Sequence, residues 1–305
     1  MSIGGPKILL VGASGQVGGQ IYRLLPPKRT LITGRTGSPT EIPLDLAALS
    51  TSADTEHLLA GHEISAIYCI AGMTAVDLCE EQPEVAQAIN CTGPLRLAEA
   101  ASCRSIPFVF FSTEYVFDGI DGPYNEDSLT NPLSVYGRSK RDGEQAVLDA
   151  YLRALVIRTT VVYGPDRPRF KGGKQNNYLY SVVRNLTHGT SMRVPIDQIS
   201  TPSYNCDVAR VTVDLVARGA TGIYHVCGPE MFGRLEFAHS IAAEWGLDAS
   251  LLHGVSTASL KQKAARPLNA GLLTDKLRKN HPDLRMRTLK EALADCRREV
   301  LAAVP

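Results

Sequence analysis

The sequence predicts an α/β protein of the Rossmann type, with a doubly wound parallel sheet and a smaller, mostly helical C-terminal lobe. Short β-branched runs alternate with segments of helical spacing, which is the order of a parallel sheet with helices on both faces. Glycine or proline marks several of the ends. The runs expected to be strands cover residues 7–11, 29–33, 66–70, 107–112, 154–160 and 223–227.

The composition suits one large α/β domain or two smaller ones, because 44% of the 305 residues are hydrophobic and 21% are charged. The 32 Lys and Arg residues nearly balance the 31 Asp and Glu residues, so no bulk field attracts nucleic acid or an anionic membrane. The apolar stretches are shorter than the ~18 residues of a membrane span. We expect a cytoplasmic protein without nucleic-acid or membrane partners, in which a local site holds any anionic ligand.

The first predicted strand leads directly into a glycine-rich turn that opens a helix. Glycines at such a junction permit a tight turn and a close approach of the backbone to a pyrophosphate, whose charge then lies at the positive end of the helix. This pattern predicts a dinucleotide site. The residues expected to form it are Gly12, Ser14, Gly15, Gln16, Val17 and Gly18.

The second predicted strand ends where an acidic side chain would take the ribose 2′-hydroxyl of NAD. Gly34 and Arg35 stand there instead. A guanidinium pairs with a 2′-phosphate, so Arg35 predicts NADP(H) in preference to NAD(H), although a solvated loop arginine is the alternative. Asp45 is placed to meet the adenine edge, but an ordinary turn aspartate fits that position nearly as well.

A tyrosine and a lysine four residues apart suggest a site for reducing a carbonyl. On a helix, Tyr136 and Lys140 project from one face. Lys140 can lower the pKa of the Tyr136 hydroxyl and bind the nicotinamide ribose, so that the phenol acts as a general acid. Thr113 lies at the carboxyl end of the fourth strand, where it can donate to the same substrate oxygen.

Beyond residue 165 the alternation of strands and helices weakens. We expect residues 1–165 and about 203–230 to form the nucleotide-binding domain, and about 166–202 with 231–305 to form the smaller lobe. The clearest helix of that lobe begins at a capping box of Thr288 and Glu291.

The order of the glycine loop, Thr113, Tyr136 and Lys140 is similar to that of extended short-chain dehydrogenases/reductases. The motifs within 71–80, 112–119, 124–126, 136–140 and 197–202, together with Asn90, Pro132 and 266–269, resemble those of the dTDP-4-dehydrorhamnose reductase family. A relative of that family is the regulatory β subunit of methionine adenosyltransferase. The resemblance extends from Lys7 to about Leu293.

The resemblance implies a reductase of a nucleotide-activated deoxysugar that uses NAD(P)H, with Thr113, Tyr136 and Lys140 as its catalytic triad. The smaller lobe would bind the substrate, and a homodimer is the expected assembly, as in many relatives. Arg266 suits a pyrophosphate because its guanidinium binds phosphate oxygens, with a surface salt bridge as the alternative. The cofactor site gains Leu46, Ala71 and Gly72, and the expected substrate residues are Thr74, Val76, Glu114, Tyr115, Asn177, Tyr178 and Arg266.

Several residues depart from the pattern of the relatives. Glu114-Tyr115 replaces the Asp-Glu pair of sugar-nucleotide dehydratases, which favours simple carbonyl reduction over elimination. Met73 and Val161 stand where the reductase usually has Tyr and Trp, so the floor of the sugar pocket changes. Gln20 replaces a magnesium-binding Glu, and we predict no metal. The basic run at 167–174 is either a diphosphate clamp or a solvated loop.

Two other functions stay open at this point. One is a non-catalytic, NADP-binding regulatory subunit, which the intact Thr113, Tyr136 and Lys140 argue against. The other is a reductase of a small non-sugar carbonyl in secondary metabolism, which the loss of both aromatics makes credible.

Overall fold

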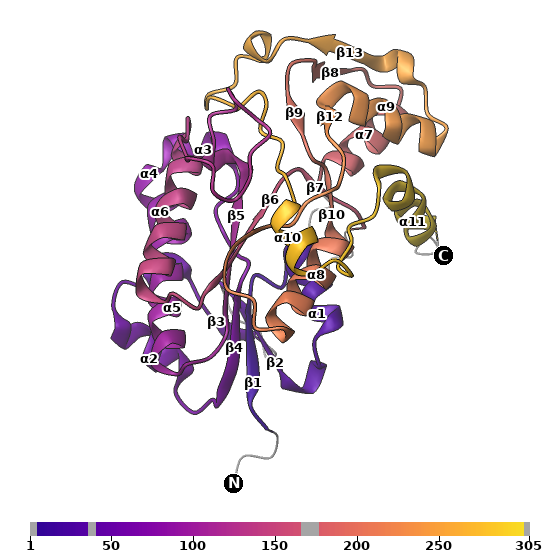
Figure 1. Ribbon diagram of the computed structural model, residues 1–305. Helices are drawn as coiled ribbons and strands as arrows, with labels where there is room; N and C mark the ends of the chain where they lie inside the picture. The colour runs from indigo at the N-terminus through magenta and orange to yellow at the C-terminus, as the bar shows by residue number, and fades with distance from the viewer. Residues whose placement is uncertain (1–4, 36–40, 166–176, 302–305) are drawn as a thin grey trace.

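The computed structural model describes residues 5–35, 41–165 and 177–301. Within these residues, seven parallel strands form the central sheet in the order β11-β6-β5-β4-β1-β2-β3 (Figure 1). The bounds of its strands are β1 (Lys7–Val11), β2 (Thr30–Gly34), β3 (Glu41–Pro43), β4 (Ile64–Cys69), β5 (Phe108–Thr113), β6 (Leu155–Thr159) and β11 (Gly222–His225).

The six strands predicted from the sequence are confirmed, with each end within two residues of its expected position. The order of the strands reverses between β1 and β4, because the chain crosses from one edge of the sheet back past the centre. This reversal is typical of a Rossmann-type sheet, in which ligands bind at the carboxyl ends of the strands on either side of it. The sequence analysis did not predict the edge strand β3.

Helices cover both faces of the sheet, as the doubly wound prediction requires. One face carries α1 (Gln16–Leu24) and α8 (Asn205–Ala217), and the other carries α2 (Ser52–Leu59), α5 (Gly93–Cys103) and α6 (Val135–Ala150) (Figure 1). Neighbouring strand residues alternate between these two layers. Leu10 packs with Ile21 of α1, whereas Leu9 packs with Leu97 of α5. Strands buried on both faces explain the nearly continuous apolar runs in the sequence.

Short helical segments connect the strands on the α6 side. They include α3 (Val76–Glu81), α4 (Pro83–Gln87) and the π-helical turn η3 (Ala88–Thr92), which leads into α5. The 3₁₀ turns are η1 (Pro27–Arg29), η2 (Leu46–Ala48), η4 (Glu114–Val116), η5 (Ala249–Leu251) and η6 (Thr257–Leu260).

A second hydrophobic core lies above the carboxyl ends of the sheet strands (Figure 1). Its helices are α7 (Tyr178–Thr187), α9 (Arg234–Trp245) and α11 (Leu289–Leu301). The capping box of Thr288 and Glu291 is confirmed by hydrogen bonds in both directions. Three pairs of short strands accompany the helices: β7 (Val162–Tyr163) with β10 (Ser203–Tyr204), β8 (Met192–Pro195) with β13 (Leu252–Val255), and β9 (Ile199–Ser200) with β12 (Phe232–Gly233).

One part of the C-terminal segment returns to the sheet. Leu277 of α10 (Asp275–Asn280) packs in the same core as α1 and α8, together with Leu284 and Met286. The chain therefore crosses between the two cores more than once, and the boundaries given above for the two lobes stay a prediction.

Candidate active site

The glycine loop has the shape that a close approach of backbone to a diphosphate needs. Gly12 has a φ of +100°, and a Cβ on it would lie 2.6 Å from the backbone nitrogen of Ala71. A Cβ on Gly18 would overlap the carbonyl oxygen of Gly12. Glycine is thus required at both positions, because Gly12 needs left-handed backbone and both sites lack space for a side chain.

The N-terminus of α1 is open to an anion. Its N-cap is Gly15, no side chain caps it, and its first turn holds no acidic residue. The first amides of the helix and the helix dipole therefore favour a negatively charged group there. Ser14 and Gly15 are exposed, whereas the Val17 side chain lies in the core, so Val17 offers only its backbone N–H. These residues fit a dinucleotide.

The residues expected around the adenosine lie beyond the next strands. Arg35 is exposed directly after β2. Asp45 caps η2 by accepting a hydrogen bond of 3.0 Å from the Ala47 N–H, and Leu46 is buried beneath it. Asp45 thus has the turn role that the sequence left open, and its contact with adenine stays a prediction.

A continuous line of contacts leads from the glycine loop to the catalytic residues. Ala71 follows β4 against Gly12, and its N–H donates to the carbonyl of Val11 at 3.0 Å. A Cβ on the next residue, Gly72, would lie 3.7 Å from Lys140 Nζ. The expected cofactor residues of β1 and β4 therefore adjoin Lys140.

Tyr136 and Lys140 lie in the first two turns of α6, which Ser134 caps by accepting from the Gly137 N–H at 3.1 Å. Both are buried, with 8% of Tyr136 and 4% of Lys140 exposed. The ammonium lies 4.0 Å from the centroid of the Phe110 ring. Burial lowers the pKa of Lys140 to about 8, because the charged form loses water.

The pKa of Tyr136 is raised in this structure, by burial first and then by the nearby carboxylate of Glu114, while the Thr113 hydroxyl opposes the shift. The sequence predicted that Lys140 would lower this pKa, and the direction differs because desolvation of the phenolate dominates here. A raised pKa keeps the phenol protonated. Tyr136 therefore holds the proton that a general acid must give.

Thr113 ends β5 and is tied to its neighbour. Its hydroxyl donates to Glu114 Oε2 at 2.7 Å and accepts from the Tyr115 N–H at 3.3 Å. Burial raises the pKa of Glu114, and the hydrogen bond from Thr113 opposes that shift. Glu114, Thr113 and Tyr136 thus form one buried group at the carboxyl end of the sheet.

A further site residue, Asn90, lies in the π-helical turn η3 and is fully buried. Its side chain accepts from the Met73 N–H at 2.8 Å and donates to the Met73 carbonyl and to Ser139 Oγ, both at 3.0 Å. Ser139 in turn donates to the Tyr136 carbonyl. Asn90 therefore fixes the segment after β4 to the catalytic helix. The sequence signal was its place in the family motif, because a π-helical turn has no pattern of its own.

The expected floor of the sugar site lies beside Tyr136. Met73, Val76 and Tyr115 pack around Tyr136, and the Tyr115 and Tyr136 rings meet edge to face at 5.4 Å. Thr74 is exposed at the start of this segment. Val161 has a φ of +40°, which is strained for a β-branched residue. Such outliers are common at functional sites, where the surrounding packing maintains them.

Arg266 approaches the same place from the C-terminal half of the chain. It forms an ion pair with Asp77 at 2.9 Å and donates to the Tyr115 hydroxyl at 3.3 Å. Only 11% of its side chain is exposed, and its Nε is buried without a hydrogen-bond partner among the described residues. The salt bridge that the sequence left as an alternative is thus present, and the contact with a pyrophosphate stays a prediction.

The other two predicted substrate residues begin α7. Asn177 caps this helix, and its amide donates to Gly164 and to the side chain of Gln16 at 3.0 and 3.3 Å. Tyr178 donates to the Arg234 carbonyl, while the Arg234 guanidinium lies 5.0 Å from the Tyr178 ring. The structure thus places Asn177 against the glycine loop, and their contacts with a sugar stay predictions.

Arg234 was missed by the sequence analysis. This cation at the start of α9 is close enough to act electrostatically on the pKa values of Glu114 and Tyr115. A single arginine between a short strand and a helix carries no motif, so only the fold reveals that it faces the catalytic end of the sheet.

The position expected for a magnesium ligand carries a neutral amide in a protein contact. Gln20 donates to the Pro165 carbonyl at 3.0 Å and accepts from Arg23 at 3.1 Å. In the described parts of the chain, no group of three or more His, Cys, Asp or Glu side chains is arranged to hold a metal ion. The basic run at 167–174 lies outside the described residues.

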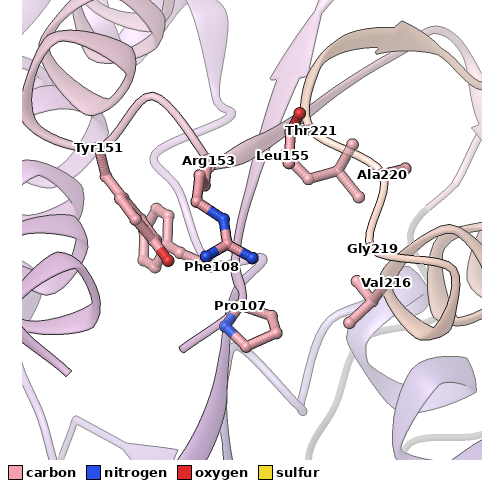
Figure 2. A pocket seen from close by; sticks show the side chains of 9 residues that line it. All are labelled: Pro107, Phe108, Tyr151, Arg153, Leu155, Val216, Gly219, Ala220 and Thr221. Atoms are coloured by element: carbon pink, nitrogen blue, oxygen red, sulfur yellow. The ribbon is translucent and has the colours of Figure 1, made fainter. Parts of the chain in front are cut away.

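One hollow lies away from this site. Figure 2 shows it at the amino ends of β5, β6 and β11, opposite the carboxyl ends where Thr113 lies; Pro107, Phe108 and Arg153 are among the residues that line it.

Among the helices within the described ranges, none combines the length and apolarity that crossing a membrane would require.

A Rossmann-type parallel sheet with a glycine loop and a buried Thr, Tyr and Lys at its carboxyl edge defines the class of extended short-chain dehydrogenases/reductases. A family model described as the RmlD substrate binding domain matches residues 6–301. The chain therefore belongs to this family, as the sequence motifs predicted.

Relatives of the chain carry several names. It is 35% identical to a probable low-salt glycan biosynthesis reductase, Agl14, of Haloferax volcanii, over 85% of this chain and 86% of the relative. It is 33% identical to the dTDP-4-dehydrorhamnose reductase of Salmonella typhimurium, over 90% and 91%. It is also 29% identical to the methionine adenosyltransferase 2 subunit beta of Xenopus tropicalis, over 92% and 84%.

The fold agrees with that of a solved reductase. The dTDP-4-dehydrorhamnose reductase of Bacillus anthracis, solved in complex with NADP, superposes with a TM-score of 0.84 at 27% identity, over 96% of this chain and 99% of that one.

Proposed function

We propose that this protein is an NADPH-dependent reductase that acts on a keto group of a nucleotide-activated deoxysugar, as the dTDP-4-dehydrorhamnose reductases do. The observation that carries the proposal is the contact line from the glycine loop through Ala71 and Gly72 to Lys140, with Tyr136 and Thr113 beside it. A cofactor loop and a proton donor thus lie side by side at the carboxyl ends of the central strands. A carbonyl bound between them could receive a hydride from the cofactor and a proton from the tyrosine.

When bound, a nicotinamide would supply the hydride, and three residues of the chain would have separate roles. Tyr136 gives its phenolic proton to the substrate oxygen, which its raised pKa makes available. Thr113 binds the same oxygen, and Lys140 holds the nicotinamide ribose.

Glu114 supports Thr113 in this scheme. Its Oε2 accepts the hydrogen bond from the Thr113 hydroxyl at 2.7 Å and so fixes Thr113 Oγ beside Tyr136, while burial raises the pKa of the Glu114 carboxyl. Donors aimed at an oxygen that gains charge are the usual source of such catalysis. Elimination would need a second carboxylate after Thr113, and Tyr115 stands there instead.

The substrate would lie between the sheet edge and the smaller lobe. Arg266 and Arg234 approach this region from two different segments and are suited to the diphosphate. Thr74, Val76 and Tyr115 would border the sugar. Met73 and Val161 replace the Tyr and Trp that dTDP-4-dehydrorhamnose reductases usually have. The sugar pocket would therefore admit a sugar that differs from the substrate of those reductases.

The preference for NADPH is part of the proposal and is supported by Arg35 at the end of β2. We propose that the reaction needs no metal, since the neutral Gln20 is engaged with Pro165 and Arg23. Cytoplasmic location and a homodimer remain predictions.

Absorbance at the reduced nicotinamide band tests the proposal when NADPH is mixed with dTDP-4-dehydro-6-deoxyhexose. We expect loss of absorbance that dTDP inhibits competitively. Turnover of a simple ketone without any effect of nucleoside diphosphates would instead indicate a reductase of non-sugar carbonyls.

A regulatory subunit is the second candidate, favoured by the likeness to the methionine adenosyltransferase subunit. It predicts tight NADPH binding, no oxidation with any nucleotide sugar, and recovery of a stoichiometric enzyme partner in a pull-down. The complete Thr113, Tyr136 and Lys140 set makes the reductase the better supported function.

A further inference from the structure

The sheet carries a carboxylate at the end of β2 that does not come from β2. Glu41 opens the edge strand β3 and pairs in parallel register with Ile32. Paired residues of neighbouring strands point to the same face, and Ile32 packs in the core with α1. The Glu41 side chain therefore lies on the face of the sheet that α1 covers.

The Glu41 carboxylate lies across the last residue of β2. Its Oε2 is 2.5 Å, and its Oε1 3.3 Å, from the point that a Cβ on Gly34 would occupy. A side chain at position 34 would thus displace the carboxylate. Because Gly34 has no side chain, the Glu41 carboxylate can reach the carboxyl end of β2.

This end of β2 is the place where dinucleotide-binding sheets hold the adenosine ribose. β2 lies beside β1, and β1 leads into the glycine loop on the same face. An acidic side chain at the end of β2 normally takes the ribose 2′-hydroxyl, whereas an arginine nearby accommodates a 2′-phosphate. Here the acid comes from the neighbouring strand, and Arg35 follows Gly34 directly.

We propose that Glu41 is a cofactor-specificity residue that accepts the ribose 2′-hydroxyl of NADH and opposes the 2′-phosphate of NADPH, against the pull of Arg35. The inference rests on the proposed dinucleotide site and refines its NADPH preference. The two opposite charges set the ratio of the two affinities: the carboxylate gains a hydrogen bond from a hydroxyl but repels a phosphate, and the guanidinium pairs with the phosphate alone.

Fluorescence titration of NADH and NADPH on the same preparation tests this, with Glu41→Gln as the main variant. Removal of the charge should tighten NADPH about tenfold and weaken NADH about fivefold, as expected for a hydrogen bond or repulsion that involves a charged group. Competition by 2′,5′-ADP and 5′-ADP should shift in the same two directions, which locates the effect at the adenosine.

Three further variants make the test specific. Gly34→Ala displaces the carboxylate without removing it and should move the ratio of the dissociation constants in the same direction as Glu41→Gln. Arg35→Leu should weaken NADPH and leave NADH unchanged. Glu63→Gln removes an exposed carboxylate just before β4, at the opposite end of the sheet, and should leave both constants unchanged.

The ratio of two constants does not depend on the folded fraction, so partial unfolding of a variant does not obscure the result. Equal changes in both constants for Glu41→Gln, or none, would overturn the role of Glu41 while the dinucleotide site stands. Failure of the unaltered protein to bind either dinucleotide would overturn the proposed function itself.

Discussion

At the scale of single residues, the site holds charged and polar groups where water cannot reach them. Lys140 is the clearest case, because its ammonium is buried against an aromatic ring and its pKa falls to about 8. The folded state therefore pays a free-energy cost for keeping this residue charged at neutral pH. Such a cost is typical of functional residues, which are selected for chemistry rather than for stability.

Lys140→Met should stabilise the protein at pH 7 while it abolishes turnover. The folded pKa of Lys140 lies below its ordinary value of 10.5, so the unfolded state binds more protons between about pH 8 and 10.5. The lysine thus costs stability below pH 8, by about 1–3 kcal/mol, and this cost fades as the pH rises toward 10.5.

Urea unfolding of both proteins at pH 7 and pH 10 measures this difference. The gain of the methionine variant should be largest at pH 7. A variant that is less stable than the unaltered protein at pH 7 would contradict the account of Lys140 as a destabilising buried charge.

At the scale of elements, the catalytic helix α6 packs closely against its neighbours because glycines stand at the points of contact. A Cβ on Gly137 would overlap the Tyr115 carbonyl oxygen, and one on Gly143 would overlap the Asn90 carbonyl oxygen. These contacts bring α6 directly against η4 and η3. The positions of Tyr136 and Lys140 thus depend on the packing of this helix.

Gly137→Ala should therefore destabilise the protein and slow catalysis together. We expect a loss of about 1–3 kcal/mol, because an added methyl overpacks a backbone contact, and a fall in kcat of about tenfold or more. Urea unfolding and steady-state kinetics measure the two effects.

Gly19→Ala is the matched control. A Cβ there would meet its nearest neighbour, the carbonyl oxygen of Ala13 before α1, at 3.5 Å, which is an ordinary van der Waals contact. This variant should be neutral or gain about 0.5–1 kcal/mol from helix propensity. Similar losses of stability and kcat in both glycine variants would contradict the claim that the close contact of α6 with η4 positions the catalytic residues.

The sequence predicted the elements whose side chains repeat with a clear period. The sheet strands β1, β2, β4, β5, β6 and β11 and the capped helix α11 are of this kind, because burial on two faces or a capping box leaves a local pattern. β3 has only three residues, and η3 is a single π-helical turn, so neither has a period to detect. Glu41 and Arg234 were missed because their positions depend on strand register and on lobe packing.

At the scale of the whole molecule, a buried polar group fastens the sheet to the segments that cross above it. Arg158 of β6 forms a buried ion pair with Glu144 of α6 at 2.7 Å and lies 3.5 Å from Nε2 of His225 on β11. His225 Nδ1 is 3.0 Å from the Leu273 carbonyl. The cluster thus links three elements that a local sequence pattern cannot connect.

This cluster should make the protein sensitive to acid. Burial, and then the charge of Arg158, lower the pKa of His225 to about 3, so the unfolded state binds more protons between about pH 3 and 6.5. Stability should fall as the pH drops below 6.5, by about 2 kcal/mol at pH 5, at about 1.4 kcal/mol for each pH unit.

His225→Gln removes the titrating ring and keeps an amide that can donate to Leu273. Urea unfolding at pH 7 and pH 5 compares the two proteins, and the pH 5 loss should be about 2 kcal/mol smaller in the variant. An equal loss in both would assign the acid sensitivity to other groups.

The most direct test of the central claim compares Tyr136→Phe with the unaltered protein in NADPH oxidation driven by dTDP-4-dehydro-6-deoxyhexose. Phenylalanine keeps the ring that packs against Tyr115 and removes only the proton donor. We expect kcat to fall by about a hundredfold or more, with NADPH affinity unchanged. Retained turnover in the variant would contradict the assignment of Tyr136 as the general acid.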